Sequence, residues 1–101
     1  NFTTLPKPIV KLTSLTELYL DNNQLVALPD SIAALTALEK LHLSSNQLAT
    51  LPNSIAVLTA LEELDLSNNP LAKPQSSAVE AWLAALQAEE CEVMMPEDGE
   101  W

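Results

Sequence analysis

The sequence has no arginine and, among its 101 residues, only one glycine, one cysteine and four lysines. With one glycine it cannot form the glycine-rich loops in which backbone closely approaches a bound phosphate. A formal net charge of −10 argues against nucleic acid, because cationic side chains that neutralise phosphates supply much of that affinity. One cysteine can form neither an internal disulfide nor a multi-cysteine zinc site. We therefore expect no cofactor, no metal ion and no nucleic-acid partner.

Long hydrophobic runs are also missing, although apolar residues make up 48% of the chain. They are dispersed and never reach the roughly 18 consecutive residues of a membrane-spanning helix, so no membrane span is expected. Their number suits one modest core in a single domain of about 100 residues. The lack of disulfide-linked caps favours a cytoplasmic, reducing location without establishing it.

Leucine is abundant instead, with 20 residues spaced by a period of 23. Leu15, Leu38 and Leu61 begin three copies of the pattern L-x-x-L-x-L-x-x-N-x-L, and residues 15–37 and 38–60 are identical at 14 of 23 positions. A partial unit precedes them, and the third copy loses the pattern after Leu71. The chain resembles the leucine-rich repeat family, in its 23-residue L-P-x-x-I class, over residues 5–71. This resemblance implies an α/β fold: a short right-handed solenoid with a parallel sheet on its concave face and helical turns on its convex face.

The repeat also has a direct physical interpretation. Alternating leucines in L-x-L point to one face of a strand, so stacked copies would form buried columns that no single unit could bury alone. The asparagines that follow each strand, Asn23, Asn46 and Asn69, are expected to satisfy backbone groups of the turning chain. The prolines that recur in the repeat, Pro6, Pro29 and Pro52, fit the start of a helical turn.

A different pattern follows the repeats. Ser77 and Glu80 have capping-box spacing, and apolar residues recur at helical intervals, which predicts a helix over about 77–90. Trp82 is expected to cover the end of the leucine columns. A last strand around Cys91 is expected to align with the strand around Leu64, burying the thiol. We thus divide the chain into a partial repeat (1–14), the repeats (15–75) and a capping helix with a last strand and acidic tail (76–101).

The outward strand positions would form the binding surface of such a solenoid. The expected partner-binding residues form three columns across the strands. The first column is Glu17, Lys40, Glu63 and Glu90, and the second is Tyr19, His42, Asp65 and Glu92. The third is Asp21, Ser44 and Ser67, and it ends with Met94. Acids dominate this set, so a basic protein or peptide is the expected partner.

Two chemical interpretations of these residues are weaker. His42, Asp65 and Ser44 resemble a nucleophilic triad, but a shallow sheet offers neither an oxyanion hole nor a cleft, and we expect no enzyme. Glu63, Asp65, Glu90 and Glu92 could attract a cation, but strand spacing does not supply the six to eight ligands that calcium prefers, so only incidental binding is expected.

Alternatives to a binding module remain open. An exposed N-terminal edge with Phe2, Leu5 and Ile9 would allow a homodimer. The chain could instead be a structural, spacer or self-associating segment of a larger signalling or effector protein, or a designed consensus-like repeat without a natural partner.

Overall fold

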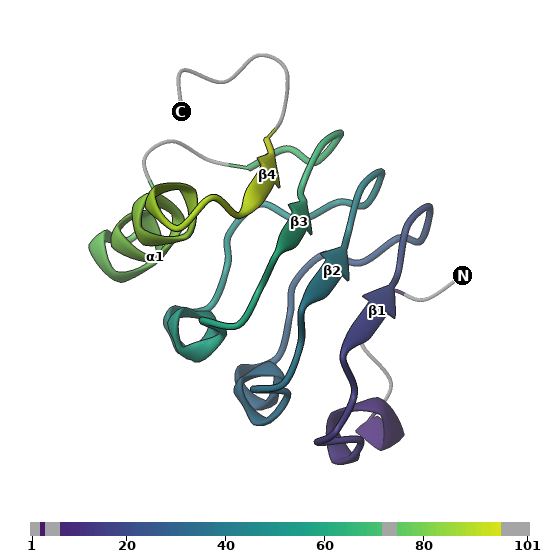
Figure 1. Ribbon diagram of the computed structural model, residues 1–101. Coiled ribbons are helices and arrows are strands. Elements are labelled where there is room, and N and C mark those ends of the chain that lie inside the picture. Colours follow the sequence, from purple (N-terminus) through teal and green to yellow (C-terminus); the bar gives the residue numbers. More distant parts are fainter. Residues whose placement is uncertain (1–2, 4–6, 72–74, 96–101) are drawn as a thin grey trace.

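The computed structural model describes residue 3 and residues 7–71 and 75–95, which form a small repeat solenoid (Figure 1). Its elements, in chain order, are η1 (Lys7–Lys11), β1 (Glu17–Tyr19), η2 (Asp30–Ala34), β2 (Lys40–His42), η3 (Asn53–Val57), β3 (Glu63–Asp65), α1 (Ser77–Ala88) and β4 (Glu92–Met94). The four strands form one parallel sheet in the order β1-β2-β3-β4. The helical turns and α1 line up along the other side of the molecule (Figure 1).

The register of the sheet follows the 23-residue period. Leu18 pairs with Leu41, and Leu41 pairs with Leu64, so equivalent leucines of successive repeats stack directly. All three are buried, and the residues on either side of them point to the opposite face of the sheet. The predicted leucine columns are confirmed.

The core is a single apolar layer between the sheet and the helical turns. Besides the strand leucines, it contains the buried residues Leu25, Leu28, Ile32, Leu35, Leu48, Leu51, Ile55 and Leu58. Pro29 and Pro52 precede η2 and η3 in extended conformation, at the start of the turns as predicted. Pro6 lies outside the described residues.

Asparagine amides bond backbone carbonyls of the turning chain, as predicted, and the structure shows that they also join neighbouring repeats. Asn46 is 3% exposed, and its Nδ2 donates to the carbonyls of Leu20 at 3.0 Å and Leu43 at 2.9 Å. Asn69 bonds the corresponding carbonyls of the next repeat, Leu43 at 2.9 Å and Leu66 at 3.1 Å. Because backbone groups of a turn cannot be left unpaired inside the protein, these side chains fix the path of the chain after each strand.

Helix α1 covers the C-terminal end of the core. Trp82 is 4% exposed and its Nε1 donates to the carbonyl of Leu58 at 3.0 Å, which fits the predicted covering role. The predicted cap was wrong by one residue: Ser76, not Ser77, is the N-cap, and its hydroxyl accepts from the backbone N–H of Val79 at 3.3 Å. Glu80 instead accepts a bond from the backbone N–H of Gln75 at 3.1 Å.

The last strand is present, but its predicted register was wrong by two residues. Val93, not Cys91, pairs with Leu64, and Glu92, not Glu90, pairs with Glu63. The helix ends at Ala88, and Glu90 then adopts a left-handed conformation with φ of 66°. Residues that the sequence pattern assigned to the strand therefore form the turn after the helix. Since the shift is an even number of residues, Cys91 is still buried as predicted. The acidic tail from residue 96 lies outside the described residues.

Candidate functional site: the exposed face of the sheet

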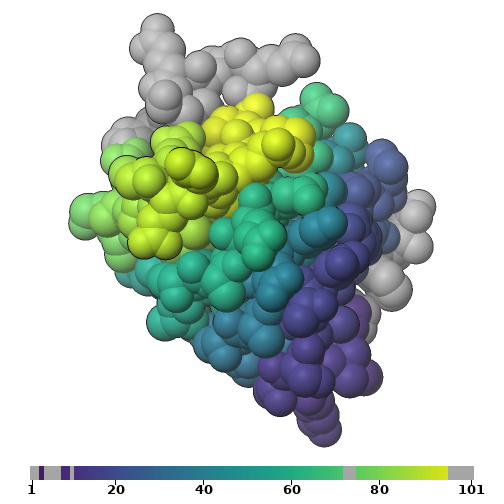
Figure 2. All heavy atoms as spheres, viewed as in Figure 1, coloured from purple at the N-terminus to yellow at the C-terminus, as the bar shows by residue number. Residues whose placement is uncertain are grey.

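The outward side chains of the strands and of the residues just after them form a continuous surface across the repeats (Figure 2). We call this surface the exposed sheet face; its residues are Glu17, Tyr19, Asp21, Lys40, His42, Ser44, Glu63, Asp65, Ser67 and Glu92. The structure therefore brings together ten of the eleven residues predicted from the sequence. The exception is Glu90, which lies in the turn between α1 and β4.

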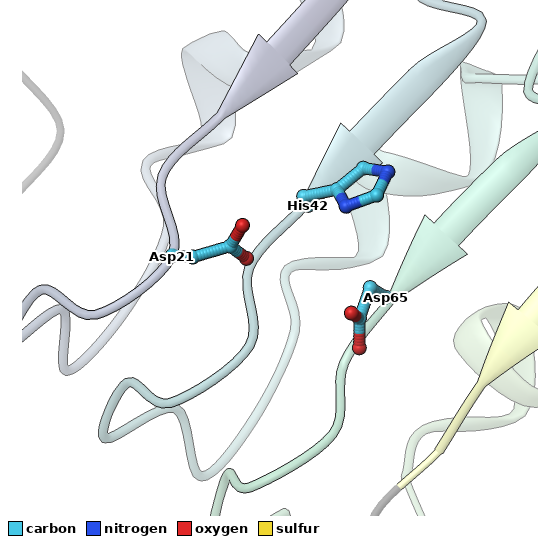
Figure 3. Close-up of side chains that lie close together, drawn as sticks. All are labelled: Asp21, His42 and Asp65. Carbon is cyan, nitrogen blue, oxygen red and sulfur yellow. The ribbon is translucent and has the colours of Figure 1, made fainter.

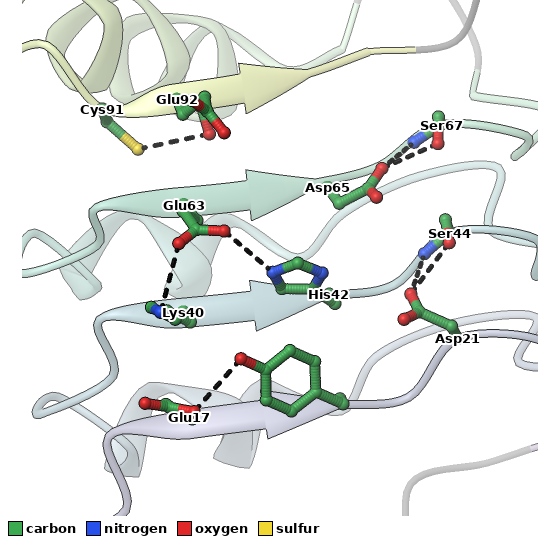
Figure 4. A network of polar contacts seen from close by, with 11 residues as sticks. Glu17, Asp21, Lys40, His42, Ser44, Glu63, Asp65, Ser67, Cys91 and Glu92 are labelled. Carbon is green, nitrogen blue, oxygen red and sulfur yellow. Dashed lines mark hydrogen bonds and ion pairs between the residues drawn. The ribbon is translucent and has the colours of Figure 1, made fainter.

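Glu63 connects the two basic side chains of β2. Its Oε2 lies 3.3 Å from Nζ of Lys40, and its Oε1 lies 3.4 Å from Nε2 of His42 (Figure 4). The hydrogen bond and charge of Glu63 raise the pKa of Lys40 above its ordinary value. The contact with His42 is close enough for an ion pair, but it is not aligned as a hydrogen bond, and Nε2 is buried without a hydrogen-bond partner.

Tyr19 provides the main aromatic surface of the exposed sheet face. Its side chain is 53% exposed, and its ring lies against that of His42, with centroids 4.6 Å apart and planes at 48°. The hydroxyl donates to Oε1 of Glu17 at 3.1 Å. Partial desolvation raises the pKa of Tyr19, and this bond to a carboxylate contributes a smaller increase.

Two aspartates are held by serines at the ends of the strands. Oδ1 of Asp21 accepts bonds from the hydroxyl of Ser44 at 2.8 Å and from its backbone N–H at 3.0 Å. Oδ1 of Asp65 accepts the equivalent bonds from Ser67 at 2.7 and 3.0 Å. Ser44 thus donates its hydroxyl proton to Asp21 rather than to His42, so the residues of the suggested triad are not arranged as nucleophile and base.

The structure also brings together three residues that the sequence analysis did not combine. Ligand atoms of Asp21, His42 and Asp65 all lie within 4.8 Å of one another, with the histidine between the two aspartates (Figure 3). The period of 23 places His42 beside Asp65, but Asp21 belongs to a different column. Its approach to the pair depends on how its side chain reaches across to Ser44 of the next repeat.

The predicted N-terminal edge lies mostly outside the described residues. Phe2 and Leu5 are not described, whereas Ile9 is partly buried and packs against the core. Leu12, also at this end, is 52% exposed. Within the described part of the chain, no helix is long and apolar enough to cross a membrane.

One strand per 23-residue unit, a ladder of buried asparagines and an open sheet face define a repeat solenoid of the leucine-rich type. Comparison with known proteins agrees: the leucine-rich repeat family matches residues 13–71, which is more than half of the chain. The chain belongs to the leucine-rich repeat family, whose members commonly mediate protein–protein interactions and are typically not enzymes.

Among solved structures, the chain is similar to a leucine-rich repeat protein of Leptospira interrogans, with 40% sequence identity and a TM-score of 0.75. The similarity covers 90% of this chain and 22% of that protein, so the chain spans about a fifth of its length. Comparison with curated proteins found no match.

Proposed function

We propose that the chain binds a basic segment of a partner protein across its exposed sheet face. The observation that carries this proposal is an excess of carboxylates without cationic partners. The carboxylate of Glu63 contacts both Lys40 and His42. Among the side chains that the structure describes, no ion pair is formed by the other four acids of this face, which are Glu17, Asp21, Asp65 and Glu92.

The spacing of these groups supports an extended basic ligand. Neighbouring strands lie about 4.8 Å apart, so the acids in and just after β1, β3 and β4 lie within reach of one extended segment, whereas β2 contributes the basic Lys40 and His42. Tyr19 adds an exposed ring of the kind that attracts lysine and arginine side chains through its face. Unpaired acids would also steer a cationic partner towards the sheet, an effect that weakens as salt concentration rises.

The test compares two variants with the same change in net charge. The sheet-face variant carries Glu17→Gln, Asp65→Asn and Glu92→Gln. The control variant carries Asp30→Asn, Glu80→Gln and Glu89→Gln, which lie on η2, on α1 and at the C-terminal cap of α1. All six changes keep side-chain shape and one hydrogen-bonding oxygen, so a difference between the variants reports where the charges lie.

Binding of a short fluorescent lysine-rich peptide would be measured by anisotropy at physiological ionic strength, where the screening length is about 8 Å. We expect the sheet-face variant to bind about tenfold more weakly than the unchanged protein, equivalent to about 1.4 kcal/mol, and the control variant to change little. Equal losses in both variants would mean that net charge, not the exposed sheet face, attracts the peptide. If only the sheet-face variant loses binding, affinity capture with the same two variants would identify the natural partner.

A second candidate function is a structural or spacer segment of a larger repeat protein. The similarity to 22% of a longer leucine-rich repeat protein favours it. This candidate predicts no saturable binding of the basic peptide by the unchanged chain, so the same titration separates the two functions.

A further inference from the structure

We propose that Asp21, His42 and Asp65 form a binding site for a first-row divalent metal ion such as Zn²⁺ on the exposed sheet face. The triplet offers one imidazole nitrogen and two carboxylates from three neighbouring repeats. Its ligand atoms lie within 4.8 Å of one another. Tetrahedral ligands about 2 Å from one ion are about 3.3 Å apart, so side-chain shifts of roughly 1–1.5 Å would complete the site.

The two aspartates are already oriented for this role. In each, Oδ1 is held by the backbone N–H and hydroxyl of a serine, Ser44 for Asp21 and Ser67 for Asp65. The other carboxylate oxygen of each aspartate points towards the space beside His42 (Figure 4). Ligating carboxylates in metal sites are commonly hydrogen-bonded in this way, which leaves one oxygen for the ion.

The orientation of the histidine ring adds an observation independent of the acids. Nε2 is buried without a hydrogen-bond partner, 3.4 Å from Oε1 of Glu63. The other ring nitrogen, Nδ1, lies on the side of the ring nearer Asp21 and Asp65 (Figure 4). A metal ion on Nδ1 would fix the proton on Nε2, where a small rotation gives it Glu63 as acceptor. Carboxylate, histidine and metal in this order are a recurrent arrangement in zinc sites.

The donor set favours a transition-metal ion over calcium or magnesium. Imidazole suits zinc and its neighbours, whereas calcium takes six to eight oxygen ligands and magnesium keeps octahedral oxygen coordination. Three protein ligands on an open surface leave further positions for water or for a group of a bound partner. An ion here would also relieve the repulsion between two carboxylates held close together.

Zinc chloride titrated into the full chain in a non-chelating buffer, followed by calorimetry, tests the proposal. We expect one saturable site per chain. Each of Asp21→Asn, His42→Gln and Asp65→Asn should weaken binding at least tenfold, because each removes one ligand. Asparagine still accepts the serine bonds through its side-chain oxygen, so local structure is kept. Glu92→Gln, with the same charge change on the same sheet, serves as the matched control and should bind zinc as the unchanged protein does.

A second measurement uses the unchanged protein alone. His42 is the only histidine in the chain, so its imidazole NMR signals report directly on ligation. We expect zinc to shift these signals at one equivalent, and an excess of calcium to leave them in place. The proposal would be overturned by an absence of saturable zinc binding or by unshifted His42 signals. Equal losses of zinc affinity in Glu92→Gln and Asp21→Asn would also overturn it, because they would show that zinc is attracted diffusely to the acids.

Discussion

Oδ1 of Asn46 accepts a hydrogen bond at 3.1 Å from the backbone N–H of Leu25, which lies 21 residues earlier in the chain. One side chain thus connects two repeats, because the amide nitrogen of the same asparagine serves carbonyls in both. The arrangement recurs one repeat later, where Asn69 accepts from the N–H of Leu48 at 3.1 Å. Packing and asparagine bonding therefore couple each repeat to its neighbour.

We expect Asn46→Ala to lower the free energy of unfolding by about 2–4 kcal/mol, because it leaves several buried backbone groups unpaired. Urea denaturation followed by circular dichroism would measure the loss. Gln47→Ala, at the exposed neighbouring position, is the control and should change stability by less than about 0.5 kcal/mol. A similar stability for both variants would show that water replaces the amide.

Replacing Trp82 tests the cover over the C-terminal end of the core. Trp82→Phe keeps an aromatic ring but leaves the carbonyl of Leu58 without its indole donor, and we expect a cost of about 1–3 kcal/mol. Trp82→Ala also opens a cavity and should cost about 3–5 kcal/mol. Thermal unfolding with Gln87→Ala, an exposed change on the same helix, as reference would rank the variants. If Trp82→Phe matches the reference, the hydrogen bond contributes nothing measurable.

Glu90 has a φ of 66°, although it carries a side chain that disfavours this conformation. Glu90→Gly should raise the free energy of unfolding by about 0.5–2 kcal/mol, the range of an improved helix cap. Glu89→Gly, at the preceding position with φ of −97°, is the matched control and should destabilise the protein. Equal effects of the two changes would contradict the assigned turn.

The second repeat also contains a residue with positive φ. Ser45 has a φ of 58°, where the equivalent residues Asn22 and Asn68 have 60° and 57°. Asparagine tolerates this region better than serine, so Ser45→Asn should stabilise the protein by a few tenths of a kcal/mol or more. Asn68→Ser provides the reverse change and should destabilise it. Chemical denaturation of both variants, measured side by side, decides the sign.

Burial raises the pKa of the Cys91 thiol, with nearby acids contributing in the same direction. Less thiolate is present at a given pH than for an exposed cysteine, so labelling at pH 8 should be much slower than in denaturant. The associated stability is fully present below the ordinary thiol pKa and declines as pH rises through the raised value. Ala84→Cys in a Cys91→Ser background places the thiol on the exposed side of α1 as control. Equal labelling rates in the two proteins would contradict the buried position.

The repeat pattern was sufficient to predict the fold, because its motif resembles the leucine-rich repeat family and its alternating leucines are buried only when copies stack on one another. The roles of Asn46 and Trp82 could be predicted for the same reason. In any stack of such repeats, backbone groups after each strand require hydrogen-bond partners, and the end of the apolar core requires a cover. The last strand was misplaced because its sequence departs from the repeat. Its register depends on where α1 ends and on the turn at Glu90.

The period of 23 specified the columns of the sheet over β1, β2 and β3, since position within a periodic strand decides which residues share a face and which strand neighbours they have. It did not determine which side chains meet across columns. Asp21 reaches Ser44 of the next repeat, whereas Asp65 turns back to Ser67 of its own repeat. These bonds, and with them the meeting of Asp21, His42 and Asp65, depend on side-chain rotation and local hydrogen bonding in the folded chain, which periodicity does not specify.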